Sequence, residues 1–467
     1  MTIEDAPATS RRALREQSGD TASDAVPAPH GRIALAWLDD DAVTAQIAAE
    51  PAQRARDLLA RRPWRSPVRA GVVVPILSVA AVAGAYAAAT LLWPLYAVLP
   101  EVDETAVPEV TADASDVAWP DDGSAAVAVE GFDTVPASTT KTAPIASITK
   151  LVTVLMALEE MPLELGEDGD EFAFTYSDRQ TYYNYLYSDE SALDVPVGGT
   201  LTEYELLQGI LIGSAGNYAD RLASTFWPTD AVFAAAAEEW LDRHGLAEVT
   251  VVGPTGISAK NKADPASVIA LAEIALDNPV IAEIVATKSV TLPGAGKIEN
   301  TNELLKDDGV VGVKTGSLSG QYNLVAAKDI AVGEQTVRVY AVTLTQPTED
   351  ARADETARLL DEVSDEVAPV TLAAETRVGT VTTPWGATAD IVTDADASVI
   401  LWDGATATTA TTLSLGDART ADQAVGSLTI TGPLDAQTVG AHLTADIPDP
   451  DAWWRLTHPL ELFGLVD

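Results

Sequence analysis

The sequence contains no cysteine, which excludes disulfide bonds, thiolate nucleophiles and cysteine-ligated metals. Histidine is nearly as scarce: the four histidines lie far apart and share no spacing typical of metal ligands. The pattern Gly-x-Ser-x-Gly, which in many hydrolases carries the serine of a Ser-His-Asp triad, is also absent. We therefore expect neither a metal enzyme nor a histidine-dependent serine hydrolase.

Basic residues are scarce in most of the chain. Of the 28 Lys and Arg, ten lie in residues 1–69, where ten Asp and Glu balance them, and residues 70–100 carry no charge. Beyond residue 100 the other 18 basic residues face 60 acidic ones. Such a surface repels phosphate backbones and anionic lipid headgroups, so we expect no nucleic-acid partner.

The uncharged run in residues 70–100 is AGVVVPILSVAAVAGAYAAATLLWPLYAVLP. About 20 apolar helical residues cross a bilayer core, so this run predicts one transmembrane helix. Pro75 and Pro94 lie near its ends, where a helix tolerates proline better than in its middle. Trp93 and Tyr96 are typical of the aromatic belt at a membrane surface.

The flanks of this run predict its orientation. Six arginines precede it between residues 54 and 69, and three acidic residues follow it between residues 101 and 104. Positive charge favours the cytoplasmic side, so we expect a cytoplasmic N-terminus and an extracytoplasmic remainder at the cell membrane. A cleaved signal peptide is the alternative, although its apolar core is usually shorter, about 7–15 residues, and closer to the N-terminus.

Composition and hydrophobic periodicity predict five segments. Residues 1–69 form a largely disordered tail, residues 70–100 the transmembrane helix and residues 101–121 a linker. Strand-like patterns enclose a helical middle within residues 122–368, which indicates an α/β sandwich of an antiparallel sheet flanked by helices, with an added helical lobe. Residues 369–467 contain short runs of Thr, Val, Ala and Gly, which predict a small β-rich domain with an amphipathic tail.

Two Ser-x-x-Lys patterns begin nine residues apart, at Ser138 and at Ser147. Ser147 starts an apolar run of helical period, so Lys150 falls one turn later on the same helix face, where ammonium and hydroxyl can meet. The pattern at Ser138 runs into Pro144, and the residue before a proline is displaced from helical backbone angles. Ser147 is therefore the candidate nucleophile; the alternative is a helix-capping serine followed by a surface lysine.

Two further motifs follow in order. GILIGSAGNYADRLA places Ser214 at a break between helical stretches, and VGVKTGSLSGQYNLVAA carries Lys314-Thr315-Gly316 on a predicted strand. The ordered set of Ser-x-x-Lys, a middle serine motif and Lys-Thr-Gly is similar to that of penicillin-interacting serine enzymes. With PIASITKLVTVLMALE and ENTNELL, roughly residues 124–365 resemble the β-lactamase/transpeptidase-like fold of low-molecular-mass penicillin-binding proteins that are serine-type D-alanyl-D-alanine carboxypeptidases.

The resemblance implies catalytic roles for three residues. Ser147 attacks the carbonyl between the two terminal D-alanines of a peptidoglycan stem peptide, Lys150 takes the serine proton, and Ser214 passes a proton to the departing amine. A lysine acts as a base near neutral pH only if its pKa is depressed by burial and a nearby cation, and Lys314 is a candidate for that cation.

The resemblance also implies a substrate-binding set. Lys314 and Thr315 bind the terminal carboxylate of the substrate, and Gly316 allows the strand to approach closely. The backbone N–H groups of Ser147 and Ser317 form the oxyanion hole.

The middle motif departs from the family pattern Ser-x-Asn, because Gly216 stands where the asparagine is expected and Asn217 follows it. The permissive glycine backbone allows one outcome, in which the loop shifts and presents Asn217 to the substrate. The other outcome is the loss of one substrate hydrogen bond, which costs about 1–3 kcal/mol and slows the reaction without abolishing it.

Together these patterns predict a membrane-anchored penicillin-binding protein that trims peptidoglycan pentapeptides, with a part in cell-wall synthesis and cell shape. We expect no metal and no organic cofactor, and we expect β-lactam antibiotics to acylate Ser147. The alternatives are a catalytically weakened or inactive muropeptide-binding protein, or a D,D-endopeptidase or β-lactamase using the same residues.

Overall fold

The computed structural model describes residues 69–466. The predicted disordered tail, with the arginines from residue 54 to residue 65, lies outside the described residues.

Helix α1 (Ala70–Leu92) is the one helix in the described part of the chain that is long and apolar enough to cross a membrane. Its side chains are largely exposed, including Val79 and Val82 at 69% and 71%. The helix ends at Leu92 and not at residue 100, so the predicted span is too long. The reason is Pro94, which lacks a backbone N–H and displaces the preceding residue from helical angles.

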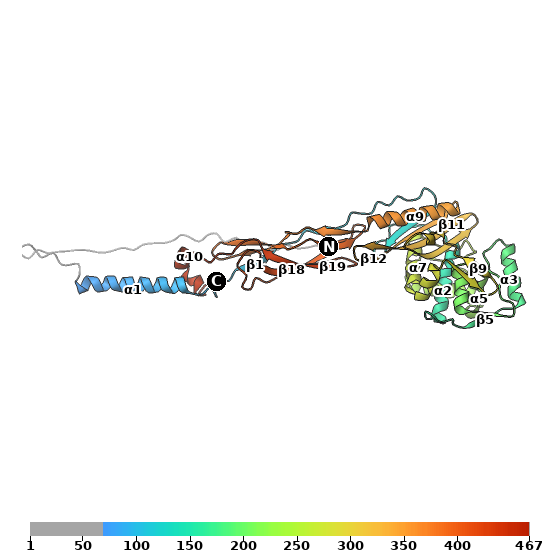
Figure 1. Ribbon diagram of the computed structural model, residues 1–467, viewed down its shortest axis with the longest axis horizontal. Helices are drawn as coiled ribbons and strands as arrows, with labels where there is room; N and C mark the ends of the chain where they lie inside the picture. The colour runs from blue at the N-terminus through green and yellow to red at the C-terminus, as the bar shows by residue number, and fades with distance from the viewer. Residues whose placement is uncertain (1–68, 467) are drawn as a thin grey trace, which may run out of the picture. The chain divides into compact units, whose positions relative to one another are not determined.

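A four-stranded antiparallel sheet with strand order β10-β11-β12-β3 forms the centre of the α/β region. Its strands are β3 (Ser124–Val129), β10 (Val310–Leu318), β11 (Gln321–Val332) and β12 (Gln335–Gln346). Figure 1 shows α9 (Glu349–Glu366) along one face of this sheet and α7 (Pro265–Asp277) with α2 (Thr149–Glu160) on the other. All six residues of β3 are buried, because helices cover both faces.

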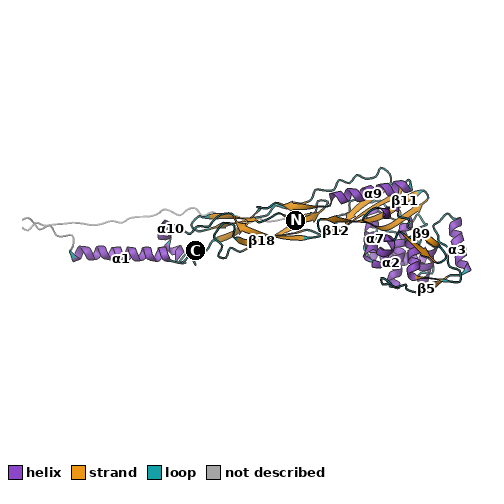
Figure 2. Cartoon of the chain, viewed as in Figure 1, coloured by secondary structure: helices purple, strands orange, loops and turns teal. Residues whose placement is uncertain are grey.

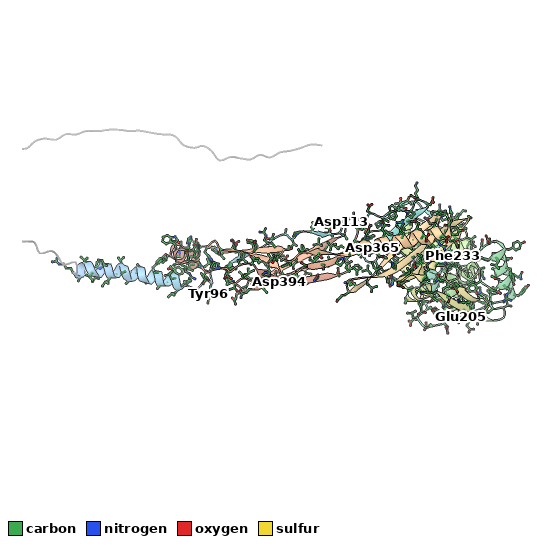
Figure 3. All side chains as sticks on the ribbon, turned by 45° about the horizontal axis from the view of Figure 1, so that its top comes forward. Tyr96, Asp113, Glu205, Phe233, Asp365 and Asp394 are labelled. Atoms are coloured by element: carbon green, nitrogen blue, oxygen red, sulfur yellow. The ribbon has the colours of Figure 1, made fainter. Side chains whose placement is uncertain are left out.

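Helix α2 lies in the core between the sheet and the helical lobe. Its apolar residues are almost completely buried, as the periodicity predicted: Leu151, Val152, Val154, Leu155 and Leu158. Around it are α3 (Tyr176–Tyr187), α4 (Glu203–Leu211), α5 (Gly216–Phe226), α6 (Asp230–Arg243) and α8 (Pro279–Ala286). Figure 3 labels two residues of this lobe, Phe233 on α6 and Glu205 on α4. The predicted sandwich with a helical lobe is thereby confirmed.

Seven strands form a second sheet with the order β1-β14-β15-β19-β18-β17-β2. Five come from the C-terminal part of the chain, which is mostly strand in Figure 2: β14 (Arg377–Thr382), β15 (Thr388–Thr393), β17 (Thr406–Leu413), β18 (Ala424–Thr431) and β19 (Ala436–Leu443). The predicted β-rich architecture is confirmed. A separate pair joins β13 (Ala368–Leu372) to β16 (Ala397–Leu401).

The segment 101–121, predicted as a linker, contributes two strands to this second sheet. β1 (Glu101–Glu104) pairs with β14, and β2 (Val110–Thr111) pairs with β17. These strands are too short to show a hydrophobic period. They form because the edge strands of the sheet present backbone N–H and C=O groups with which they can pair. The predicted linker thus contains two short paired strands.

Candidate active site

Ser147 and Lys150 lie together at the start of α2. Ser147 belongs to a 3-10 turn, Ala146–Ile148, that leads into the helix, and the Lys150 Nζ donates a hydrogen bond to the Ser147 Oγ at 2.7 Å. The preceding Ala146 has a φ of 50°, a left-handed conformation that non-glycine residues seldom adopt and that is often found at functional sites.

The other Ser-x-x-Lys pattern makes no such pair. The Ser138 Oγ accepts a hydrogen bond from the backbone N–H of Ala125 at 2.9 Å, so this serine ties its loop to strand β3. Lys141 is exposed. Of the two candidate pairs, the structure brings only Ser147 and Lys150 into contact.

Lys150 is buried, with 2% of its surface exposed, and it donates a second hydrogen bond to the carbonyl oxygen of Thr255 at 2.6 Å. Burial lowers the pKa of Lys150 to about 7, although the carboxylates of Asp220 and Glu190 act in the opposite direction. A substantial fraction of this lysine is therefore neutral near pH 7, as a proton acceptor must be.

Lys314 approaches the site from strand β10 and is also buried, with 1% exposed. Its Nζ donates to the Ser214 Oγ at 3.1 Å, which joins two motifs 100 residues apart. Burial, with the neighbouring Lys150, holds the pKa of Lys314 well below its usual range. The low pKa of Lys150 thus has burial as its cause, as predicted, whereas no contribution from the Lys314 charge is seen.

Strand β10 passes very close to the Ser147 turn. A Cβ atom at Gly316 would lie 2.7 Å from the carbonyl oxygen of Ile145 and 3.2 Å from the backbone N of Ser147, so a larger residue does not fit without displacement. Thr315 is 5% exposed, and its Oγ1 shares a hydrogen bond of 2.6 Å with Thr301.

A cavity of about 440 Å³ opens over this turn. Ser147, Lys150 and Ser317 line it on one side, and the loop around Glu190 lines it on another. The candidate nucleophile, the candidate base and Ser317 thus line one space, an arrangement suited to acyl transfer.

The middle motif divides between two places. Ser214 has a φ of 55° and contacts Lys314, and Gly216 lines the cavity that holds Ser147. Asn217 points elsewhere: its Oδ1 accepts from the backbone N–H of Leu193 at 3.0 Å and its Nδ2 donates to the Leu193 carbonyl oxygen at 2.8 Å. It does not line the cavity, so the shift that would present it to the substrate is not seen, and its substrate role remains a prediction.

Sequence reasoning missed the groups that surround Lys150 from other parts of the chain. Thr255 supplies the second hydrogen-bond acceptor, and Gly256, with a φ of 86°, lets its loop touch the Ser147 turn. The Gly-Pro-Thr-Gly pattern at residues 253–256 does indicate a tight turn, but nothing local indicates which element that turn contacts.

The model of the D-alanyl-D-alanine carboxypeptidase family matches residues 136–348. This match confirms the predicted resemblance to low-molecular-mass penicillin-binding proteins of the serine-type carboxypeptidase class. No curated protein matches the chain.

Several solved structures are similar to it. Penicillin binding protein 5 from Haemophilus influenzae is 18% identical, and the alignment covers 72% of this chain and 100% of that one with a TM-score of 0.49. The D-alanyl-D-alanine carboxypeptidase DacD from Francisella tularensis is 15% identical, and its alignment covers 74% of this chain and 97% of that one with a TM-score of 0.49. The K15 DD-transpeptidase from Streptomyces is 22% identical, and its alignment covers 53% of this chain and 98% of that one with a TM-score of 0.45.

Proposed function

We propose that this chain removes the terminal D-alanine from peptidoglycan stem pentapeptides. The premise is that residues 136–348 match the D-alanyl-D-alanine carboxypeptidase family. The observation that carries the proposal is the 2.7 Å hydrogen bond between the Lys150 Nζ and the Ser147 Oγ, inside a buried site that lowers the pKa of the lysine to about 7.

In the acylation step, the Ser147 Oγ forms a bond to the carbonyl carbon between the two terminal D-alanines while its proton passes to the neutral Lys150 Nζ. The carbonyl oxygen becomes an oxyanion, which the backbone N–H groups of Ser147 and Ser317 stabilise; the loss of one such donor typically costs about 3 kcal/mol. The C–N bond then breaks, and D-alanine leaves after its nitrogen receives, by way of Ser214, the proton that Lys150 took from Ser147, so that Lys150 is neutral again; Ser214 itself contacts Lys314.

In the deacylation step, water forms a bond to the ester carbon and gives a proton to the neutral Lys150. The bond from that carbon to the Ser147 Oγ then breaks, and Lys150 returns the proton to the Oγ as the shortened peptide leaves. The carboxylate of the substrate binds at Thr315 and Lys314. A carboxylate beside the buried Lys314 favours its charged form, so substrate binding compensates for the low pKa of this lysine in the empty site.

A penicillin should be captured by the same attack, with the β-lactam carbonyl in place of the peptide carbonyl. A D,D-endopeptidase or β-lactamase would use the same residues, and a binding-only descendant would keep the cavity without the chemistry. Gly216 is the observation that favours the last alternative, because the side chain expected at that position is absent.

The test is D-alanine release from a stem pentapeptide by the full chain in detergent micelles, with the intact mass recorded after incubation with a penicillin. We expect free D-alanine and a single covalent adduct. Release from cross-linked dimers instead of pentapeptide would indicate the endopeptidase. Pentapeptide binding with neither release nor adduct would move the assignment to the binding-only protein.

The pKa of Lys150 predicts the pH profile of acylation. The neutral amine is the reactive form, so the second-order rate constant should rise about tenfold per pH unit below pH 7 and level off above it. Stopped-flow acylation between pH 5 and pH 9 measures this profile. A rate constant that is flat through pH 7 would exclude Lys150 as the base with this pKa.

The segment boundaries and the orientation are further parts of the proposal. We propose a catalytic domain over residues 122–368 and a β-rich domain over residues 369–467, held at the cell membrane by α1 with the N-terminus in the cytoplasm. The apolar helix supports the anchor.

A further inference from the structure

The space that a side chain at residue 216 would occupy is filled by another residue. A Cβ atom at Gly216 would lie 2.5 Å from the Cε1 and 3.1 Å from the Cδ1 of Tyr185, and 3.3 Å from the carbonyl oxygen of Ser191. Gly216 and Tyr185 both line the cavity that holds Ser147 and Lys150. The wall expected to carry an asparagine side chain therefore carries a tyrosine ring from a different helix.

The ring is held in place from two sides. Tyr185 lies on α3, whose first turn is fixed by a capping box at Thr175, and its hydroxyl donates a hydrogen bond to Asp220. Asp220 lies on α5 four residues after Gly216, hence on the same helix face. Tyr183, Tyr185 and Tyr187 alternate along the sequence, a spacing typical of one strand face, but they lie on helix α3, and only Tyr185 of the three lines the catalytic cavity.

The phenol differs from an asparagine side chain in what it offers to a ligand. A carboxamide both donates and accepts hydrogen bonds, whereas the Tyr185 hydroxyl donates its hydrogen bond to Asp220, so only its oxygen lone pairs are left to bind a ligand, as acceptors. The loop that follows α3 adds Asp189 and Glu190 to the cavity wall. This wall therefore fits an N–H donor of the ligand.

We propose that Tyr185 replaces the missing side chain at Gly216 as a substrate-positioning residue, by accepting a hydrogen bond from an N–H group of the bound peptide. The role rests on the proposed function for its effect on turnover, although peptide binding tests it separately. The loss of a side chain at Gly216 is then compensated by the Tyr185 ring, so the glycine does not imply a disabled site.

The main test is Tyr185→Phe, which keeps the ring and removes only the hydroxyl, with Tyr187→Phe as the control because Tyr187 is on the same helix and 96% exposed. The full chain in detergent is titrated with a stem pentapeptide. We expect Tyr185→Phe to weaken binding about 10-fold and Tyr187→Phe to leave it unchanged.

Acylation rates separate positioning from a general structural effect. Benzylpenicillin has an acylamino N–H beside its lactam ring, whereas imipenem has a hydroxyethyl group there. Tyr185→Phe should slow acylation by benzylpenicillin about 10-fold and acylation by imipenem less than about 3-fold. Equal slowing with both β-lactams, or unchanged pentapeptide affinity, would overturn the proposal.

A side-chain exchange provides the second test. Gly216→Asn alone should impair binding because the new side chain collides with the ring, and Tyr185→Ala alone should impair it by opening the wall. The double variant should bind pentapeptide at least about fivefold more tightly than Tyr185→Ala. No recovery in a double variant whose unfolding midpoint matches that of the wild type would count against the exchange.

The two levels of failure can be told apart. If the wild-type protein reacts with neither β-lactam, the proposed catalytic function fails, and pentapeptide affinity alone decides the role of Tyr185. If the wild type is acylated while Tyr185→Phe behaves like it in every assay, the catalytic function stands and the role of Tyr185 fails.

Discussion

Ser147→Ala is expected to eliminate the covalent penicillin adduct and to reduce D-alanine release to the uncatalysed level. No other described hydroxyl has both a 2.7 Å contact with a buried lysine and a place in the cavity beneath the Lys-Thr-Gly strand. Without the nucleophile no ester forms, and neighbouring groups cannot replace the bond that is missing. Intact-mass spectrometry with a penicillin, and an assay for free D-alanine, measure the two losses.

Ser138→Ala is the matched control, because it removes the serine of the other Ser-x-x-Lys pattern. It should keep the adduct and full D-alanine release while lowering the free energy of unfolding by about 1 kcal/mol, since the backbone N–H of Ala125 loses its acceptor. An adduct that survives in Ser147→Ala and disappears in Ser138→Ala would reverse the assignment.

Lys150→Met should slow acylation about 10²- to 10⁴-fold, because the serine proton then has no acceptor. Methionine has a similar length and suits a buried site, so the fold should be retained. Lys150→Arg should be at least as inactive, since a guanidinium stays protonated, and it should also be less stable because it buries a permanent charge. Stopped-flow acylation measures the rates.

Lys150→Met should also change how the free energy of unfolding depends on pH. The pKa of Lys150 falls from 10.5 in the unfolded chain to about 7 in the fold, so between these values the unfolded state binds more protons. The free energy of unfolding should therefore rise with pH in this window, by up to about 1.4 kcal/mol per unit from this group. Lys150→Met should lack that rise. An unfolding midpoint with the same pH dependence in both proteins would contradict the burial of a titrating lysine.

Local sequence was sufficient wherever the relevant contact lies within one element. The distance between Ser147 and Lys150 follows from a spacing of three residues at a helix start, and the burial of Leu151 and Val154 follows from the helical period. The uncharged run predicted α1, and alternating or continuous apolar runs predicted strands β10 to β12 and the later β-rich sheet.

Local sequence failed where strands or side chains take their place from a distant partner. Strands β1 and β2 have too few residues for a period and exist because β14 and β17 accept them. The end of α1 was placed too late because an apolar run does not show where hydrogen bonding stops. The alternating tyrosines around Tyr185 have the period of two that is typical of a strand, although they lie on a helix.

The sequence by itself determined the order of the motifs, the choice of Ser147 over Ser138, and the departure from the family pattern at Gly216. Tertiary structure alone decided that Lys314 meets Ser214, that burial lowers the pKa of Lys150, and that a tyrosine from α3 fills the space at Gly216. The physical reason is range: helix spacing fixes neighbours within one turn, whereas the burial, charge and shape of a cavity depend on residues that only the packed chain brings together.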